Sequence, residues 1–457
     1  NHNKESTMFD AQQKQTKQSM QVKFSQFLEK FSRHLTLPES NFLHDISLGI
    51  LKSKSVICLR IASELNEKTT LKKVCERFTR HLNKQDLGLE LRNAIITEQC
   101  RGFDMETAII VDDSDIVKPK AKCMEGLKKV RDGSTGRHDQ LGYDLMNIIA
   151  YQDSDEGYEI KPICSELIAQ DLEEDSLYQI TEDRLIDITI ASNNKGVYLF
   201  DRGYDKRALF GHLQQNDMNY IVRSTGARSL IVNGHEMSFR EVAKSIKLNH
   251  KYAIKDSGSY FKCGLKRVSI RLNPHPVKHP ETIDTWLVVA RYVTGRKSKD
   301  EIAKHLDLEK GYFYLFCDFP GQPELSVCSI INKAIRMYKM RWKIEEVHRH
   351  MKQAYGWEKI QLISYTRLQN MNQIFLLTMC YLYSLKRFAY KYLLAFPSIM
   401  KYKNKTWKKI FSFVYYRLTE LVSKCFSIVT RFSINPYKGK WHDQNQLLIP
   451  CLKNGGM

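Results

Sequence analysis

The sequence predicts an α/β protein with a β-rich insertion, and two kinds of pattern support this class. Short apolar runs bounded by polar residues are typical of buried strands. Stretches with helical periodicity lie between them, at 174–192 and at 206–213. Strands that alternate with helices favour an α/β core. The strands expected in this core are 107–111, 143–151, 158–164, 197–200 and 220–223.

The pattern changes several times along the 457 residues, so more than one unit is expected. The polar start of the chain is expected to be mobile. After the core strands, apolar and polar residues alternate as in antiparallel strands, which predicts the insertion. The predicted regions are a helical N-terminal region (1–95), the first part of the α/β core (96–225), the β-rich insertion (226–324), the second part of the core (325–385) and a basic helical C-terminal region (386–457).

Charge predicts a polyanionic partner. Lys and Arg total 71 against 51 acids, which gives a formal net charge of +20, and nucleic acid is the commonest partner of so basic a chain. Residues 386–440 contain thirteen basic residues and one acid, Glu420, with aromatic residues between them. This mixture is typical of a surface that binds phosphates. In the N-terminal region, the stretch LKKVCERFTRHL has a basic face that suits DNA, although a solvated face on a packing unit explains it equally well.

Composition also excludes some classes. No apolar run reaches the roughly 18 residues that a membrane-spanning helix needs, so the apolar stretch 374–385 is expected to be a buried helix and no membrane partner is expected. The eleven cysteines form no Cys-x2-Cys pair. Reduced thiols in a cytoplasmic protein are therefore expected, rather than disulfides or structural zinc.

The stretch 338–352 reads YKMRWKIEEVHRHMK and is predicted to be one helix. Tyr338, Arg341, Glu345 and Lys352 are separated by three, four and seven residues, which places them on one stripe of that helix. An acid, two cations and a phenol could serve a phosphodiester as metal ligand, phosphate clamps and hydrogen-bond donor. A solvated helix with an Arg–Glu pair is the alternative.

Carboxylates follow two of the predicted strands. Asp112 and Asp113 come directly after 107–111, and Asp201 ends 197–200. Acids at neighbouring strand ends, together with Glu345, could converge on a pair of Mg²⁺ ions, which prefer oxygen ligands. Each acid taken alone could instead be a turn or cap residue.

These motifs resemble the DDE transposases of the insertion-sequence-four family. The spacing Tyr-x2-Arg-x3-Glu-x6-Lys matches the YREK signature of that family, and RWKIEEVHRHMK resembles its signature helix. LFDRGYD and YIVRS resemble the strand that carries the second aspartate and the strand that follows it. IIVDDSDIVKP resembles the strand that ends in the first aspartate. The likeness covers roughly residues 105–365.

The resemblance implies a ribonuclease-H-like catalytic core that is interrupted by the β-rich insertion. Asp112, Asp201 and Glu345 would be catalytic and would bind Mg²⁺, with Mn²⁺ as a substitute. Asp112 has Ser114 in the hydroxyl position of the motif, but Asp113 remains an alternative first acid and metal ligand. The residues expected to contact DNA are Tyr338, Arg341, Lys352, Arg202, Arg223, Ser224, His348, Arg349 and, by stacking on a displaced base, Trp286, for which Tyr260, Phe261 and Tyr292 are rivals.

The function implied is cut-and-paste transposition in a bacterial cytoplasm. The protein would bind double-stranded transposon ends, cleave them hydrolytically and join their 3′-hydroxyls to target DNA, as a homodimer in a synaptic complex. Two alternatives stay open. One is a stand-alone metal-dependent nuclease, and the other is a transposase-derived DNA-binding protein without catalytic activity.

Overall fold

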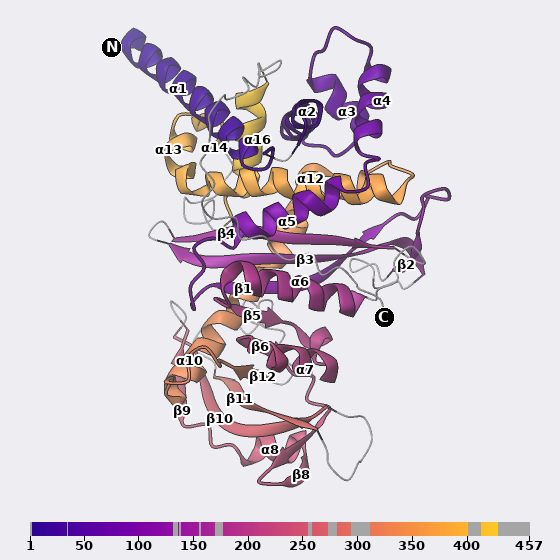
Figure 1. Ribbon diagram of the computed structural model, residues 1–457. Helices are drawn as coiled ribbons and strands as arrows, with labels where there is room; N and C mark the ends of the chain where they lie inside the picture. Colours follow the sequence, from indigo (N-terminus) through magenta and orange to yellow (C-terminus); the bar gives the residue numbers. More distant parts are fainter. Residues whose placement is uncertain are drawn as a thin grey trace, which may run out of the picture.

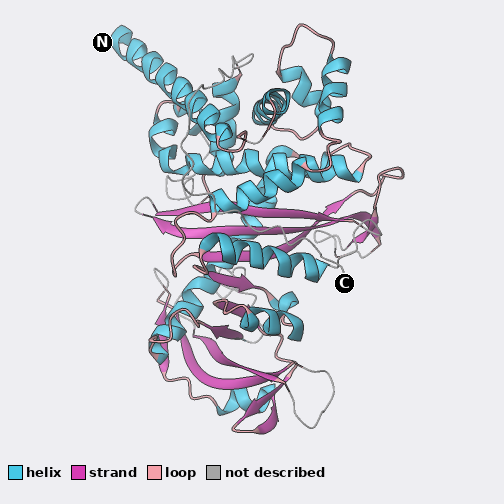
Figure 2. Cartoon of the chain, in the orientation of Figure 1, coloured by secondary structure: helices cyan, strands magenta, loops and turns pink. Residues whose placement is uncertain are grey.

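The computed structural model describes residues 2–33, 35–130, 136, 139–154, 157–169, 177–254, 258–272, 281–293, 311–400 and 413–427. Its centre is a large mixed sheet that carries helices on both faces (Figures 1 and 2). The N-terminal helices and α12 lie to one side of strands β3 and β4, and the β-rich part of the sheet extends away from them. The protein is therefore of the mixed α/β class that the sequence predicts.

The N-terminal region is helical, as predicted, but its start is not irregular. Helix α1 begins at His2, in a stretch without Gly or Pro, and is anchored by Met20, Phe24 and Leu28, which are buried at helical spacing. The backbone of the polar start is thus helical, and the buried side chains that attach α1 to the core belong to its C-terminal half. The helices here are α1 (His2–Glu29), α2 (Leu37–Ser53), α3 (Cys58–Glu64), α4 (Leu71–His81) and α5 (Leu87–Gln99).

Five strands form the centre of the sheet in the order β4-β3-β1-β5-β6. Strands β4, β3 and β1 are antiparallel neighbours, whereas β1, β5 and β6 run parallel. Helices connect the parallel strands, as crossover connections require. The bounds are β1 (Ala108–Val117), β3 (Gln140–Ser154), β4 (Gly157–Ile168), α6 (Leu177–Ser192), β5 (Val197–Phe200), α7 (Arg207–Gln215) and β6 (Tyr220–Arg223), with the short β2 (Lys128–Val130) beside β3.

The strands predicted for 226–324 are present and continue the same sheet. Strand β12 pairs antiparallel with β6, so the two parts share one layer instead of forming separate sheets. A sequence pattern predicts strands but not their partners, which is why this continuity was not foreseen. The elements are β7 (Ser229–Val232), β8 (His235–Ser238), α8 (Phe239–Ser245), β9 (His250–Ala253), β10 (Tyr260–Arg271), β11 (Thr282–Val293) and β12 (Tyr312–Asp318).

The stretch 338–352 is not a single helix, which corrects the prediction. Helix α10 (Val327–Tyr338) ends at Tyr338, a 3-10 turn covers Lys339–Arg341, and α11 (Trp342–Tyr355) follows. The 3-10 turn places residues i and i+3 in line, so Tyr338 and Arg341 still share a side. Because that spacing suits both helix types, the sequence could not reveal the tighter turn.

Helix α12 (Tyr365–Ser384) is buried almost all round and packs against β4, α5 and α2, as predicted for 374–385. No helix among the described residues has the length and apolarity to cross a membrane. The ten cysteines of the described residues are all free. After α12 come α13 (Ala389–Leu394), α14 (Pro397–Met400) and α16 (Tyr415–Phe426), while the lysines at 401–409 and the basic residues after 430 lie outside the described residues.

Candidate active site

Two consecutive aspartates on β1 point to opposite faces of the sheet. Ile110 belongs to the core on the side of α11 and α12, and Val111 belongs to the core on the side of α6 and α7. Side chains alternate along a strand, so Asp112 follows Ile110 and Asp113 follows Val111. Asp112 is therefore the aspartate on the side of the signature helix α11.

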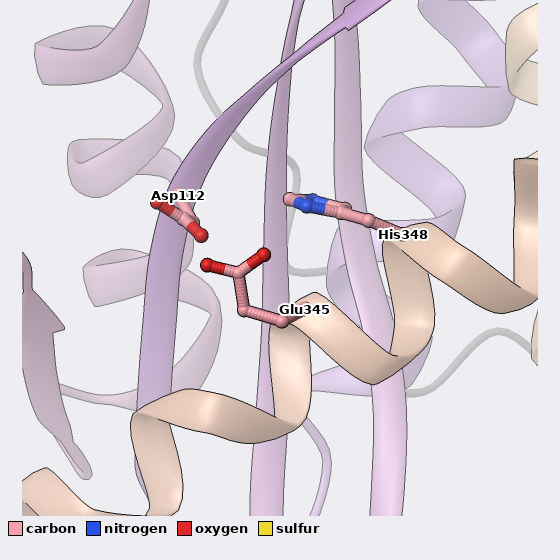
Figure 3. A group of neighbouring side chains, drawn as sticks. All are labelled: Asp112, Glu345 and His348. Carbon is pink, nitrogen blue, oxygen red and sulfur yellow. The ribbon is translucent and has the colours of Figure 1, made fainter. Parts of the chain in front are cut away.

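Asp112, Glu345 and His348 form a compact group. One possible ligand atom from each lies within 4.8 Å of the other two. Glu345 and His348 are three residues apart on α11 and so share a side of the helix. Both side chains point toward Asp112 on the neighbouring strand (Figure 3). Two carboxylates and an imidazole at this separation could hold a divalent cation.

His348 differs from an ordinary core histidine in this position. Its residue is only 7% exposed, and its Nε2 has no hydrogen-bond partner among the described residues. Burial, with Lys352 and Arg341 nearby, lowers the pKa of His348 to about 3, so the imidazole is neutral near pH 7. A neutral imidazole with an unused ring nitrogen fits a metal site chemically.

Asp201 lies next to this group but not within it. It directly follows β5, which pairs with β1, and it shares the sheet face of Asp112 because Leu199 packs in the same core as Ile110. Its carboxylate caps the 3-10 turn Arg202–Tyr204 by accepting a hydrogen bond from the amide of Gly203 at 2.7 Å. Burial and then the carboxylates of Glu345, Asp201 and Asp113 raise the pKa of Asp112 well above its usual value, while Arg341 opposes this rise.

Arg341 is the cation closest to the acids. Its Nη1 lies 3.5 Å from Asp112 and 3.8 Å from Glu345. These are ion-pair distances, and Nη1 makes no hydrogen bond among the described residues. The guanidinium thus offsets part of the negative charge without a fixed hydrogen-bond geometry.

Asp113 has a different partner. It accepts a hydrogen bond of 2.6 Å from the hydroxyl of Tyr204, which is buried on the other face of the sheet. Desolvation, together with Asp201 and Asp144, raises the pKa of Asp113 to about 6, although part of the residue is exposed and the Tyr204 hydrogen bond opposes the shift. Asp113 is thus held against the turn that carries Asp201 rather than against α11.

The predicted DNA contacts are distributed around the acids. Tyr338 is buried and stacks on Phe313, with its ring close to Arg341 and Arg223. Lys352 pairs with Asp115 at 3.5 Å and with Glu358 at 3.1 Å. The remaining predicted residues are Arg223 and Ser224, buried at the end of β6, Arg202, half-buried in the turn after Asp201, Arg349, exposed on α11, and Trp286, half-buried on β11.

Trp286 shares the sheet face of Asp112 but stands four strands away. Its register partner on β12 is Cys317, which packs in the same core as Ile110. The guanidinium carbon of Arg267 lies 5.1 Å from the centroid of the Trp286 ring. This cation comes from the neighbouring strand β10, where Arg267 is the register partner of Trp286.

Asp205 was missed by the sequence analysis and connects two loops of the site. Its side chain, which is fully buried, accepts hydrogen bonds from Ser224 Oγ at 3.1 Å and from Thr225 N at 2.8 Å, and it forms an ion pair with Arg228. The turn after Asp201 is thereby attached to the loop after Arg223. Only its position four residues after Asp201 in LFDRGYD could have drawn attention to it.

Asp205→Ala is expected to lower the free energy of unfolding by about 3 kcal/mol, because the variant leaves the Arg228 charge buried without its partner. Urea denaturation measures the change. Glu236→Ala is the matched control, because it breaks the more exposed Arg271–Glu236 pair of 2.8 Å and should cost about 0.5 kcal/mol. Equal losses for the two variants would contradict the interpretation that the buried Asp205 stabilises the contact between the two loops.

Comparison with known proteins identifies the family. Residues 104–383 match the model of the transposase DDE domain, which is more than half of the chain. A search of curated proteins found no match. The matched region begins just before β1 and ends within α12, so it contains every acid of the site. This chain belongs to the family of transposases with a DDE domain.

Proposed function

We propose that the protein is a cut-and-paste DNA transposase of the insertion-sequence-four family, with Asp112, Asp201 and Glu345 as its catalytic carboxylates. The observation that carries this proposal is the placement of the three acids on one face of the sheet, from two adjacent parallel strands and the signature helix. Mg²⁺, with Mn²⁺ as a substitute, is the proposed cofactor, since carboxylates are its preferred ligands.

The strand order supports a ribonuclease-H-like core. Three antiparallel strands followed by two parallel ones, β4-β3-β1-β5-β6, is the arrangement expected of that fold. In this interpretation β7–β12 are the insertion between β6 and the helix that supplies the last acid. The proposed boundaries remain 1–95, 96–225, 226–324, 325–385 and 386–457.

In the proposed phosphoryl transfer, the acids would bind metal ions and the other residues of the site would position the substrate. Bound divalent ions would lower the pKa of an attacking water and neutralise charge on the leaving oxygen. Asp112, Asp201 and Glu345 would hold these ions. Once such ions offset the charge of the acids, Arg341 would be available to the substrate, and its fork of N–H groups suits a phosphate oxygen pair. Arg223, Tyr338 and Lys352 would position the same strand from the surrounding elements.

Double-stranded DNA is the proposed partner, for both the transposon ends and the target. The net charge of +20 supports it, because Lys and Arg side chains that bind phosphates release counterions from the DNA, and this release favours association. We also propose that two copies act together in a synaptic complex, as each reaction must join two ends. Arg202, Ser224, Arg349 and the C-terminal region 386–457 are the proposed further DNA contacts.

The experiment that tests the function is a strand-transfer assay on a pre-cleaved end. The substrate is a DNA end taken from inverted repeats, if the DNA that flanks the coding sequence contains them. Wild-type protein with Mg²⁺ should join the 3′-hydroxyl of that end to a target plasmid. Cleavage of intact ends without joining would favour the stand-alone nuclease, and binding without either reaction would favour the inactive DNA-binding protein.

Trp286→Ala should slow cleavage of an intact end, by about tenfold if the indole contributes 1–3 kcal/mol of base stacking. An abasic site at the displaced position removes the need to unpair a base, so it should partly rescue the variant. Tyr292→Phe is the control, since its hydroxyl bonds Ser259 and its ring remains. Equal cleavage of intact ends by wild type and Trp286→Ala would remove Trp286 from the mechanism.

A further inference from the structure

Helix α11 places an imidazole beside the carboxylates of the site. His348 lies one turn after Glu345, and a ring nitrogen of it lies within 4.8 Å of oxygens from both Glu345 and Asp112. The imidazole points at these oxygens, not along the helix surface (Figure 3). Arg349, the next residue, is exposed, whereas His348 lies on the buried side of α11.

His348 fits neither of the usual structural roles of a buried histidine. A histidine that only packs in a core normally satisfies its ring nitrogens, as His350 does by bonding Tyr383 at 3.1 Å and Thr419 at 2.9 Å. In contrast, Nε2 of His348 is buried without a hydrogen-bond partner among the described residues. Among the described residues, the ion pairs of Asp112 and Glu345 are made with Arg341 and not with His348.

We propose that His348 is a metal ligand, so that the two divalent-ion positions of the site differ in ligand chemistry. One position would be held by Asp112, Glu345 and His348, and the other by Asp112 and Asp201 with oxygens only. This inference rests on the proposed function for the identity of the second position. Its own evidence is the geometry of the Asp112, Glu345 and His348 group.

The two ion positions should differ in metal selectivity. Mg²⁺ takes oxygen ligands almost exclusively, whereas imidazole nitrogen suits first-row transition metals. The position that includes His348 should therefore accept Mn²⁺ more readily than Mg²⁺, and the oxygen-only position should not discriminate in this way. Replacing His348 by Gln substitutes an oxygen ligand and should reduce the preference for Mn²⁺.

The test is electron spin echo envelope modulation on the full chain with Mn²⁺ alone as the probe. Wild-type protein should show coupling from a coordinated ¹⁴N nucleus, and ¹⁵N-histidine labelling should change that coupling. His348→Gln should remove it and weaken Mn²⁺ binding by at least the roughly 10- to 100-fold that is typical for loss of an outer-shell partner. His235→Gln, which removes an exposed histidine on β8, should leave the signal unchanged.

Each contrary result has a definite meaning. Bound Mn²⁺ without nitrogen coupling, or coupling that survives His348→Gln in a variant with unchanged circular dichroism, would overturn the proposal. Absence of Mn²⁺ binding would overturn it as well. The strand-transfer assay on the same preparation keeps the two conclusions separate. Joining of DNA by wild-type protein without nitrogen coupling would reject His348 as a ligand and leave the transposase function standing.

Discussion

Glu345→Gln is expected to abolish metal-dependent cleavage of transposon ends, with a loss on the order of 10³-fold or more. The amide keeps the shape of the side chain but removes the charge that would hold a divalent ion between α11 and β1. Asp201→Asn should have an effect of the same size, because it removes the carboxylate at the end of the adjacent strand β5. Gel cleavage assays in Mg²⁺ measure both losses.

Binding to the ends should remain within about twofold in both variants, because the acids repel DNA phosphates rather than attract them. Glu346→Gln is the matched control. Glu346 is the next residue on the same helix, but its carboxylate pairs with Lys343 at 2.6 Å instead of facing Asp112. Near-normal Mg²⁺-dependent cleavage by Glu345→Gln, or an equal loss in Glu346→Gln, would refute the assignment.

Local sequence patterns predicted the positions of many of the helices and strands. The strands and the helix at 177–192 lie where apolar runs and periodicity predicted them, because these elements bury side chains whose spacing is visible in the sequence. The order of the strands is a different matter. Pairing of β12 with β6 joins residues about a hundred positions apart, and no local pattern specifies such a partner.

In the site, too, groupings within one segment were predictable from the sequence, and contacts between distant segments were not. Tyr338, Arg341 and Glu345 could be grouped because they are close in sequence. The sequence analysis expected His348 to contact DNA. The metal-ligand role proposed for it depends on a carboxylate from a distant strand, which its spacing from Glu345 does not reveal. Asp205 was missed for a related reason, because its partners Ser224 and Arg228 come from another loop.

The choice between Asp112 and Asp113 illustrates what the structure adds. In the sequence the two are adjacent acids after one strand, and the spacing to Ser114 selects Asp112 but leaves Asp113 as an alternative. In the structure they face opposite sides of the sheet, with Asp112 beside Arg341 and Glu345 and Asp113 bonded to Tyr204. The geometry therefore favours Asp112 as the proposed metal ligand.

Asp112→Asn is expected to eliminate end cleavage, by on the order of 10³-fold, whereas Asp113→Asn should lose no more than about tenfold. An asparagine at 113 can still accept the hydrogen bond from the Tyr204 hydroxyl through its amide oxygen, so the turn that carries Asp201 keeps its support. An asparagine at 112 has no such substitute for its charge. Tyr204→Phe should resemble Asp113→Asn, because it breaks the same contact from the other side.

The single-turnover cleavage rates of the three variants in Mg²⁺ provide the comparison. A larger loss in Asp113→Asn than in Asp112→Asn would transfer the catalytic role to the other face of the strand, and a severe loss in Tyr204→Phe alone would show that the turn, rather than either aspartate, limits the reaction.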